Sequence, residues 1–155
     1  MAIDIDKVWE IMEGESCMFV DIDDGEPRAR PMAAYPDKSE GAIWFVTKRD
    51  SSKVDEVEED QRVCLTFNPD SGTWLSVTGD ARTVENRDKV HDIWNDGMKA
   101  WFEGPDDPSI ILIKVTPEFG EAWEGPTGVV QRAKMMFAAV TGAKPSFGEN
   151  KKLTF

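Results

Sequence analysis

The sequence predicts one mainly antiparallel α+β domain whose strands close into a small barrel. The chain has 155 residues, the length of a single domain, and its 40% of hydrophobic residues can bury one sizeable core. About six strand-like segments follow one another in hairpins, with short helices between them and without the strand–helix alternation of a parallel sheet. Closure into a barrel would protect the edges of such a sheet.

The first element expected is a short helix over residues 6–12. Val8, Ile11 and Met12 recur at helical spacing, and an acidic residue at the start of the segment is an N-cap candidate.

A β-hairpin is expected next. Residues 17–22 and 28–35 read as extended segments on either side of Asp24 and Gly25, a two-residue turn signal. A third strand follows over residues 42–47.

A short helix should follow the third strand. Ser52 and Asp55 fit a capping box, and Val54 and Val57 give the helix an apolar face.

A second hairpin comes from residues 63–67 and 74–84, with a turn at residues 68–72. Val90, Ile93 and Trp94 then predict a helix, and its apolar face is extended by three further residues, Met98, Trp101 and Phe102.

The remaining segments complete the domain. Residues 110–115 are almost continuously apolar, as expected of a central strand covered on both faces, and a last helix is expected over residues 129–140. No repeat or linker marks a second domain, so residues 1–155 are expected to form one domain with a basic C-terminal helix and tail at about 128–155.

Charge excludes several kinds of partner. The formal net charge is −12, which repels nucleic acid and anionic membrane surfaces. The N-terminus lacks a basic, apolar signal, and no apolar run reaches the roughly 20 residues of a membrane span, so a cytoplasmic location is expected. Two separate cysteines, Cys17 and Cys64, and a single histidine, His91, predict reduced thiols and no metal site.

Charge is also uneven along the chain. Residues 128–155 carry five basic residues against one acid, and this segment is expected to pack on an acidic body, its own or that of a partner subunit. The five basic residues are Arg132, Lys134, Lys144, Lys151 and Lys152.

A cluster of cations elsewhere predicts an anion site. Five basic residues fall around the second and third strands: Arg28, Arg30, Lys48, Arg49 and Lys53. Ser51, Ser52 and Lys53 lie at a predicted helix start, where free backbone N–H groups favour a phosphate, and Arg30 can add a bidentate contact. The alternative is that Ser52 only caps the helix while these cations make surface ion pairs with Asp50, Asp55 and Glu56.

At these residues the sequence resembles a known family. The segments around Arg30 and Lys53 are similar to those of the pyridoxamine 5'-phosphate oxidase-like FMN-binding split barrels, in particular the bacterial general stress protein branch. Further matches follow in family order over nearly the whole chain: residues 28–32, 43–47, 51–53, 77–81, Trp94, 99–102, 106–108 and 148–153.

The resemblance implies a homodimer of six-stranded antiparallel split barrels with short flanking helices, and FMN at the subunit interface. Arg30 and Lys53 would contact the phosphate, with Ser51 and Ser52 assisting. The residues that would border the flavin are Pro31, Met32, Phe45, Val46 and Thr47.

Aromatic residues complete the site that the resemblance implies. Trp74 stands where the oxidase branch tends to carry a polar Gln. Trp101 and Phe102, or Trp123, would cover the flavin ring from the partner subunit; the alternative is that they are core aromatics.

Two departures argue against pyridoxamine phosphate oxidation. The Arg/His-containing C-terminal segment that grips this substrate is replaced by residues 133–142 and a general-stress-type tail, and Tyr35 replaces an expected Lys. The resemblance as a whole implies an FMN-dependent oxidoreductase of unidentified substrate. The alternatives are a non-catalytic FMN-binding or FMN-buffering protein, or a split barrel that uses deazaflavin or haem, the last disfavoured by the single imidazole.

Overall fold

A computed structural model describes residues 3–14, 16–70, 72–125, 128–142 and 149–155. Its elements, in chain order, are α1 (Ile5–Met12), β1 (Ser16–Asp23), β2 (Glu26–Ala33), β3 (Tyr35–Asp37), β4 (Ala42–Lys48), α2 (Ser52–Glu59), β5 (Arg62–Phe67), β6 (Thr73–Val84), α3 (Arg87–Ile93), the 3₁₀ helix η1 (Asp96–Ala100), β7 (Ile110–Glu124), α4 (Gly128–Thr141) and β8 (Glu149–Thr154). Ser71 of the predicted turn, and Lys144 and Gly148 of the predicted tail, lie outside the described residues.

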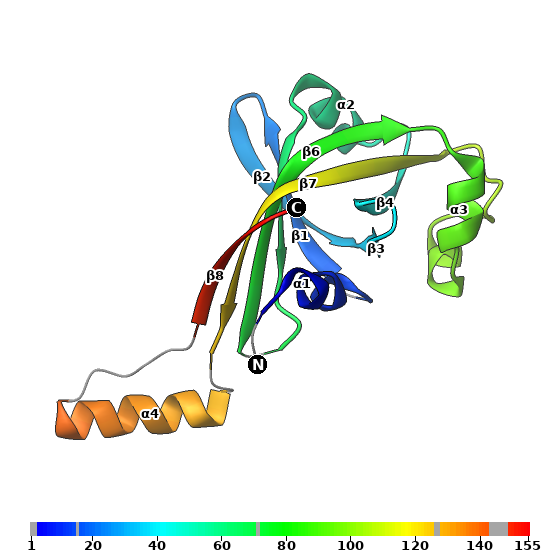
Figure 1. Ribbon diagram of the computed structural model, residues 1–155. Helices are drawn as coiled ribbons and strands as arrows, with labels where there is room; N and C mark the ends of the chain where they lie inside the picture. Colours follow the sequence, from blue (N-terminus) through cyan, green and yellow to red (C-terminus); the bar gives the residue numbers. More distant parts are fainter. Residues whose placement is uncertain (1–2, 15, 71, 126–127, 143–148) are drawn as a thin grey trace.

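All strand pairs of this part of the chain are antiparallel. The sheet has the order β2-β1-β5-β6-β7-β4-β3, and β8 pairs with β7 beside this path (Figure 1). The described residues thus contain eight strands where six were expected. The additions are the three-residue β3, which continues the second predicted strand after a break, and β8, which lies in the predicted tail.

Strand β7 organises the sheet because it is paired along both edges. One edge follows β6 from Thr73 to Val84. The other edge pairs first with β4, through Ile110–Val115, and then with β8, through Phe119–Glu124. The predicted strand at residues 110–115 is confirmed, and it continues to Glu124.

The two hairpins are confirmed. Between β1 and β2, Asp24 (φ 50°) and Gly25 (φ 80°) both adopt positive φ, the conformation that a tight two-residue hairpin requires. Asp and Gly tolerate this conformation better than other residues, so this turn could be predicted from the sequence.

The first two helices are confirmed, but their caps lie one or two residues earlier than expected. Asp4 caps α1 by accepting from Lys7 N–H, and Ser51, not Ser52, is the N-cap residue of α2.

The helix expected through Phe102 is two shorter pieces. Helix α3 ends at Ile93, Trp94 has an extended ψ of 135°, and η1 starts afresh at Asp96. Asn95 causes the restart, because its side-chain oxygen accepts from Gly97 N–H at 3.0 Å and so caps η1.

Two apolar clusters lie on opposite faces of β4. Ile43 and Phe45 join the main core inside the sheet, together with the buried face of α1. Trp44 points the other way, into a smaller cluster under α3 and η1 that includes Met98 and Phe102. The strand at residues 110–115 is covered on both faces, as predicted, because Ile113 and Val115 join the main core while Ile110 and Leu112 join the smaller cluster.

Helix α4 confirms the last predicted helix and stands away from the barrel (Figure 1). The side chains that the structure describes in it are largely exposed, including Met136 at 71% and Val140 at 87%. No helix among the described residues is long and apolar enough to cross a membrane.

Candidate functional site

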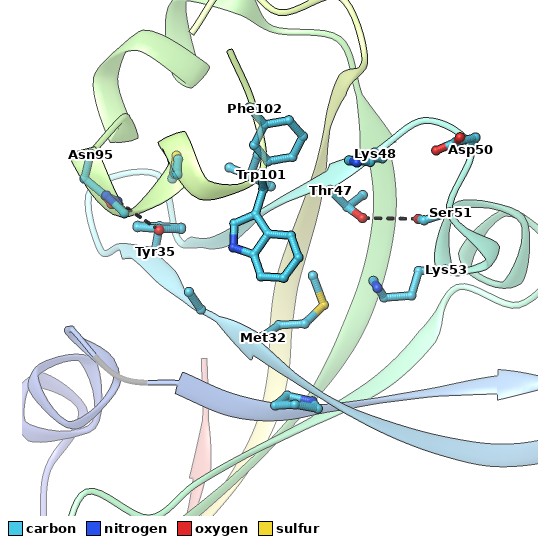
Figure 2. Close-up of a pocket in the computed structure, with 15 residues that line it drawn as sticks. Met32, Tyr35, Thr47, Lys48, Asp50, Ser51, Lys53, Asn95, Trp101 and Phe102 are labelled. Carbon is cyan, nitrogen blue, oxygen red and sulfur yellow. Dashed lines mark hydrogen bonds between the residues drawn. The ribbon is translucent and has the colours of Figure 1, made fainter. Parts of the chain in front are cut away.

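A pocket of about 650 Å³ opens between the barrel and η1, a volume in the usual range of small-molecule sites. Its lining comes from the end of β2, the start of β3, the end of β4, the start of α2 and the η1 segment (Figure 2). The lining residues are Pro31, Met32, Ala33, Tyr35, Val46, Thr47, Lys48, Asp50, Ser51, Lys53, Asn95, Gly97, Met98, Trp101 and Phe102.

One end of the pocket is polar and cationic. Figure 2 places Lys48, Asp50, Ser51 and Lys53 together there, where β4 leads into α2. The hydroxyl groups of Thr47 and Ser51 lie 3.1 Å apart in a hydrogen bond. Ser51 makes no side-chain cap bond to α2, and Val54 N–H donates to the Ser51 carbonyl at 3.1 Å, so the N–H groups of Ser52 and Lys53 are those available to an anion.

Lys53 is the cation of this end that is best suited to bind an anion. Burial lowers its pKa below the ordinary value, and the nearby positive charge of Arg30 lowers it further. Among the described residues none forms an ion pair with Lys53, whereas Arg30 and Arg49 both pair with glutamates. A partly buried ammonium group without a counter-ion gains more from a bound anion than one that is already paired.

Arg30 does not line the pocket and forms ion pairs with two acids. Its guanidinium donates two hydrogen bonds to Glu56, at 2.5 and 2.7 Å, and one to Asp21 at 3.3 Å. These contacts join β2 to α2 and to β1, and they use the fork geometry in which arginine binds a carboxylate most strongly.

The pKa values of the two acids in contact with Arg30 are shifted in opposite directions. Hydrogen bonding from Arg30 lowers the pKa of Glu56 to about 2. The Asp21 side chain is fully buried, and this burial, together with the neighbouring Glu56, raises the pKa of Asp21 to about 6. Asp21 Oδ1 has no hydrogen-bond partner within the described structure, which adds to the cost of ionising it.

Six of the ten residues predicted to hold the flavin line this pocket: Pro31, Met32, Val46, Thr47, Ser51 and Lys53. Four do not. Arg30 points to Glu56, Ser52 lies in the first turn of α2 outside the lining, and Phe45 is fully buried against Phe19 in the main core. Trp74 is 53% exposed and lines a separate cavity of about 220 Å³ next to Met18.

The cation cluster predicted from the sequence is only partly assembled at the pocket. Lys48 and Lys53 line it, whereas Arg28 lies near Asp23 at the hairpin end and Arg49 pairs with Glu85. The alternative of ion pairing therefore holds with its expected partner for Arg30, which pairs with Glu56, whereas Arg28 and Arg49 pair with acids that were not expected, Asp23 and Glu85.

Two of the three aromatic residues expected to cover the flavin line the pocket of their own chain, and cover from a partner subunit stays a prediction. Trp101 and Phe102 follow η1 and line the pocket together with Lys53, and Trp123 does not line it. Sequence reasoning missed Asn95 and Gly97, although an Asn two residues before a Gly, directly after the apolar face of a helix, is a signal for a new cap.

Comparison with known proteins agrees with this architecture. The family model described as "Pyridoxamine 5'-phosphate oxidase like" matches residues 4–146. The chain belongs to this family. The mostly antiparallel sheet with a few helices is accordingly the split barrel that the sequence predicted.

Individual relatives of this pyridoxamine 5'-phosphate oxidase-like chain point to the general stress branch. The chain is 25% identical to general stress protein 26 of Bacillus subtilis over 117 residues, which cover 72% of this chain and 82% of that protein. It is 35% identical to protein bli-3 of Neurospora crassa over 98 residues, which cover 56% of this chain and 47% of the relative, so this match spans about half of the relative's length.

A solved structure adds a flavin-binding neighbour. The general stress FMN/FAD binding protein of Xanthomonas citri superposes with a TM-score of 0.68 at 26% identity, covering 79% of this chain and 89% of that one.

Proposed function

We propose that this protein binds FMN in the pocket between the barrel and η1 and acts as a flavin-dependent oxidoreductase of the cytoplasm. The observation that carries the proposal is Lys53, a partly buried cation without an ion-pair partner among the described residues, at one end of a pocket of about 650 Å³. The family and the flavin-binding relative support a flavin as the ligand.

The pocket offers the two kinds of contact that a flavin phosphate ester needs. Lys53, the hydroxyl groups of Thr47 and Ser51, and the first turn of α2 would hold the phosphate. The apolar side chains of Met32, Val46 and the η1 aromatics would pack against the ring.

Bound FMN would supply electron or hydride transfer, and the protein would supply binding, orientation and electrostatics. Met32, Trp101 and Phe102 provide apolar surface that excludes water from the ring. This division of labour needs no nucleophile or acid–base pair of the protein, in keeping with the lack of a catalytic triad motif in the sequence.

We further propose that the protein is a homodimer and that each FMN lies at the subunit interface. The exposed apolar side chains support this: Trp101 is 73% exposed at the pocket, and α4 presents Met136 and Phe137 to solvent. Apolar surface of this kind is typical of protein–protein contacts.

The phosphate contact can be tested by comparing FMN with riboflavin in fluorescence titrations. The wild type should bind FMN more tightly, and Lys53→Ala should weaken FMN binding by about ten- to a hundredfold while leaving riboflavin unchanged. Lys7→Ala, which removes an exposed lysine of α1 outside this pocket, is the matched control. Equal affinity of the wild type for FMN and riboflavin would refute the phosphate site.

Lys53 is a better test than Arg30. Replacing Arg30 leaves Asp21 and Glu56 buried without their cation, which destabilises the fold and confuses the interpretation of binding. To separate an enzyme from an FMN-buffering protein, the FMN-loaded protein is mixed with NADH or NADPH, since only an oxidoreductase would bleach and recover the flavin absorbance.

A further inference from the structure

We propose that the Tyr35 hydroxyl donates a hydrogen bond to a ring carbonyl of the bound molecule, and that Asn95 positions this hydroxyl. The inference rests on the proposed pocket and names a recognition element at its second end. Figure 2 shows Tyr35 and Asn95 on the opposite side of the pocket from Lys53 and Ser51, with Trp101 between the two groups.

A chain of hydrogen bonds fixes the direction of donation. The backbone N–H of Gly97 donates to Asn95 Oδ1 at 3.0 Å, so the amide oxygen is occupied and the amide nitrogen must face the other way. Asn95 Nδ2 then donates to the Tyr35 hydroxyl oxygen, also at 3.0 Å. The phenol oxygen is an acceptor in this bond, which leaves its own O–H free to donate.

That O–H has no acceptor among the described residues, and Tyr35 lines the pocket. A hydroxyl that accepts a hydrogen bond becomes a stronger donor, because hydrogen bonds in a chain polarise one another. The molecule in the pocket is the remaining source of an acceptor besides water.

Both residues are held by regular structure. Tyr35 begins β3 and pairs with Trp44 of β4, and its side chain packs against the cluster that contains Met98 and Phe102. Asn95 is fixed as the cap of η1. The donor is therefore positioned before a ligand arrives, which reduces the entropy lost on binding.

The surroundings identify the chemical class of the acceptor. The charged lining residues in Figure 2, Lys48, Asp50 and Lys53, all lie at the other end. The lining residues around Tyr35 that the structure describes are uncharged, and they include Met98 and Trp101. This environment suits a planar, uncharged ring that carries a carbonyl oxygen.

Two molecules carry this chemistry. One is the flavin itself, whose ring carbonyls would reach Tyr35 if the phosphate is bound at Lys53. The other is a separate planar substrate such as a quinone. The test therefore uses two probes: FMN, and 2-methyl-1,4-naphthoquinone added to the FMN-loaded protein.

Two variants remove the donor in different ways. Tyr35→Phe deletes the hydroxyl and keeps the ring. Asn95→Asp keeps the cap on Gly97, but its second oxygen can only accept, so it draws the Tyr35 hydrogen away from the pocket. The matched control is Asn86→Asp, since Asn86 caps α3 by accepting from Lys89 N–H and does not line the pocket.

We expect both variants to weaken binding of one probe by about three- to tenfold, measured by calorimetry. Asn86→Asp should bind both probes as tightly as the wild type does. The melting temperature of Asn95→Asp should equal that of the wild type. Weakened FMN binding assigns the carbonyl to the flavin, and weakened quinone binding alone assigns it to a second substrate. Unchanged binding of both probes overturns the inference. If the wild type does not bind FMN, the proposed function fails, but a quinone titration of the flavin-free protein still tests Tyr35. In that titration the inference is overturned if Tyr35→Phe binds the quinone as tightly as the wild type does. It is also overturned if the wild type does not bind the quinone.

Discussion

Arg30 and Lys53 lie close enough for the charge of one to lower the pKa of the other, yet their surroundings suit them to different tasks. Arg30 spends its guanidinium on Glu56 and Asp21 and so fastens β2 to α2. Lys53 lines the pocket and pairs with no acid of the described chain. Arg30 therefore supports the structure, and the proposed anion contact falls to Lys53.

The burial of Asp21 beside Glu56 predicts a pH-dependent difference between the wild type and Asp21→Asn. The folded pKa of Asp21, about 6, is raised above its ordinary value of 3.8, so the stability that this carboxyl contributes is present below pH 4 and is lost as the pH rises through 6. Asn cannot ionise. The stability of Asp21→Asn relative to the wild type should therefore increase between pH 4 and pH 6 and then level off.

Urea denaturation of both proteins at several pH values from 4 to 7 measures this difference. The opposite effect of Glu56, whose lowered pKa of about 2 makes stability fall below pH 4.5, is confined to the acid end of this range. A difference that stays constant across this range would show that Asp21 remains ionised in the folded protein throughout.

For single residues, the sequence predicted which side chains belong to the anion site better than it predicted which side chains they contact. The anion site was predicted from Ser51, Ser52 and Lys53, and two of these line the pocket. The Arg30–Glu56 pair depends on how β2 and α2 come together in the fold, 26 residues apart, and no local pattern contains that information. The shift of the α2 cap to Ser51 lies within the usual uncertainty of helix ends.

Strands with a clear pattern of apolar residues were predicted with nearly correct bounds. Strand β4 was expected over residues 42–47 and ends at Lys48. The second half of β7 was missed because residues 116–124 contain Pro117 and Gly120 and lack an apolar run, and their strand structure comes from pairing with β6 and β8. Tertiary pairing of this kind cannot be deduced from local propensity.

The irregularity of β6 against β7 predicts a strict requirement for glycine at residue 79. The register shifts between Thr78 and Gly79, and a Cβ on Gly79 would lie 2.2 Å from the backbone oxygen of Thr116. Backbone cannot yield as a flexible side chain can, so Gly79→Ala should lower the free energy of unfolding by about 3 kcal/mol.

Chemical denaturation checks this value. Gly104→Ala is the matched control, because a Cβ on Gly104 meets no atom within 4 Å and its backbone is not in the left-handed region. Equal stability of the two variants would mean that the bulge between β6 and β7 can relax.

For the whole molecule, the antiparallel barrel could be predicted from the order of the hairpins and from the composition. The placement of α4 could not be predicted from the sequence. The described side chains of α4 carry exposed apolar groups at Met135, Met136, Phe137 and Val140. This exposed apolar surface supports the proposed homodimer, and because each protomer has a net charge of −12, apolar burial and not long-range attraction would drive its association.

Sedimentation velocity tests the proposed homodimer. The wild type should sediment as a dimer, and Phe137→Asp should shift the equilibrium toward monomer and weaken FMN binding, because a charge placed in an apolar interface is costly to bury. Lys134→Gln, on the same helix, should leave both properties unchanged. A wild-type monomer that binds FMN at full affinity would contradict the interfacial site.

The return of the chain as β8 has a consequence for aggregation. Residues Phe119–Glu124 of β7 would otherwise present an open row of backbone N–H and C=O groups, next to the exposed side chains of Phe119 and Trp123. Such an edge is a template on which another chain can add a strand. By occupying it, Glu149–Thr154 keeps this half of β7 from nucleating aggregates, and Lys151 and Lys152 place positive charge on the new outer edge, which discourages further strand addition.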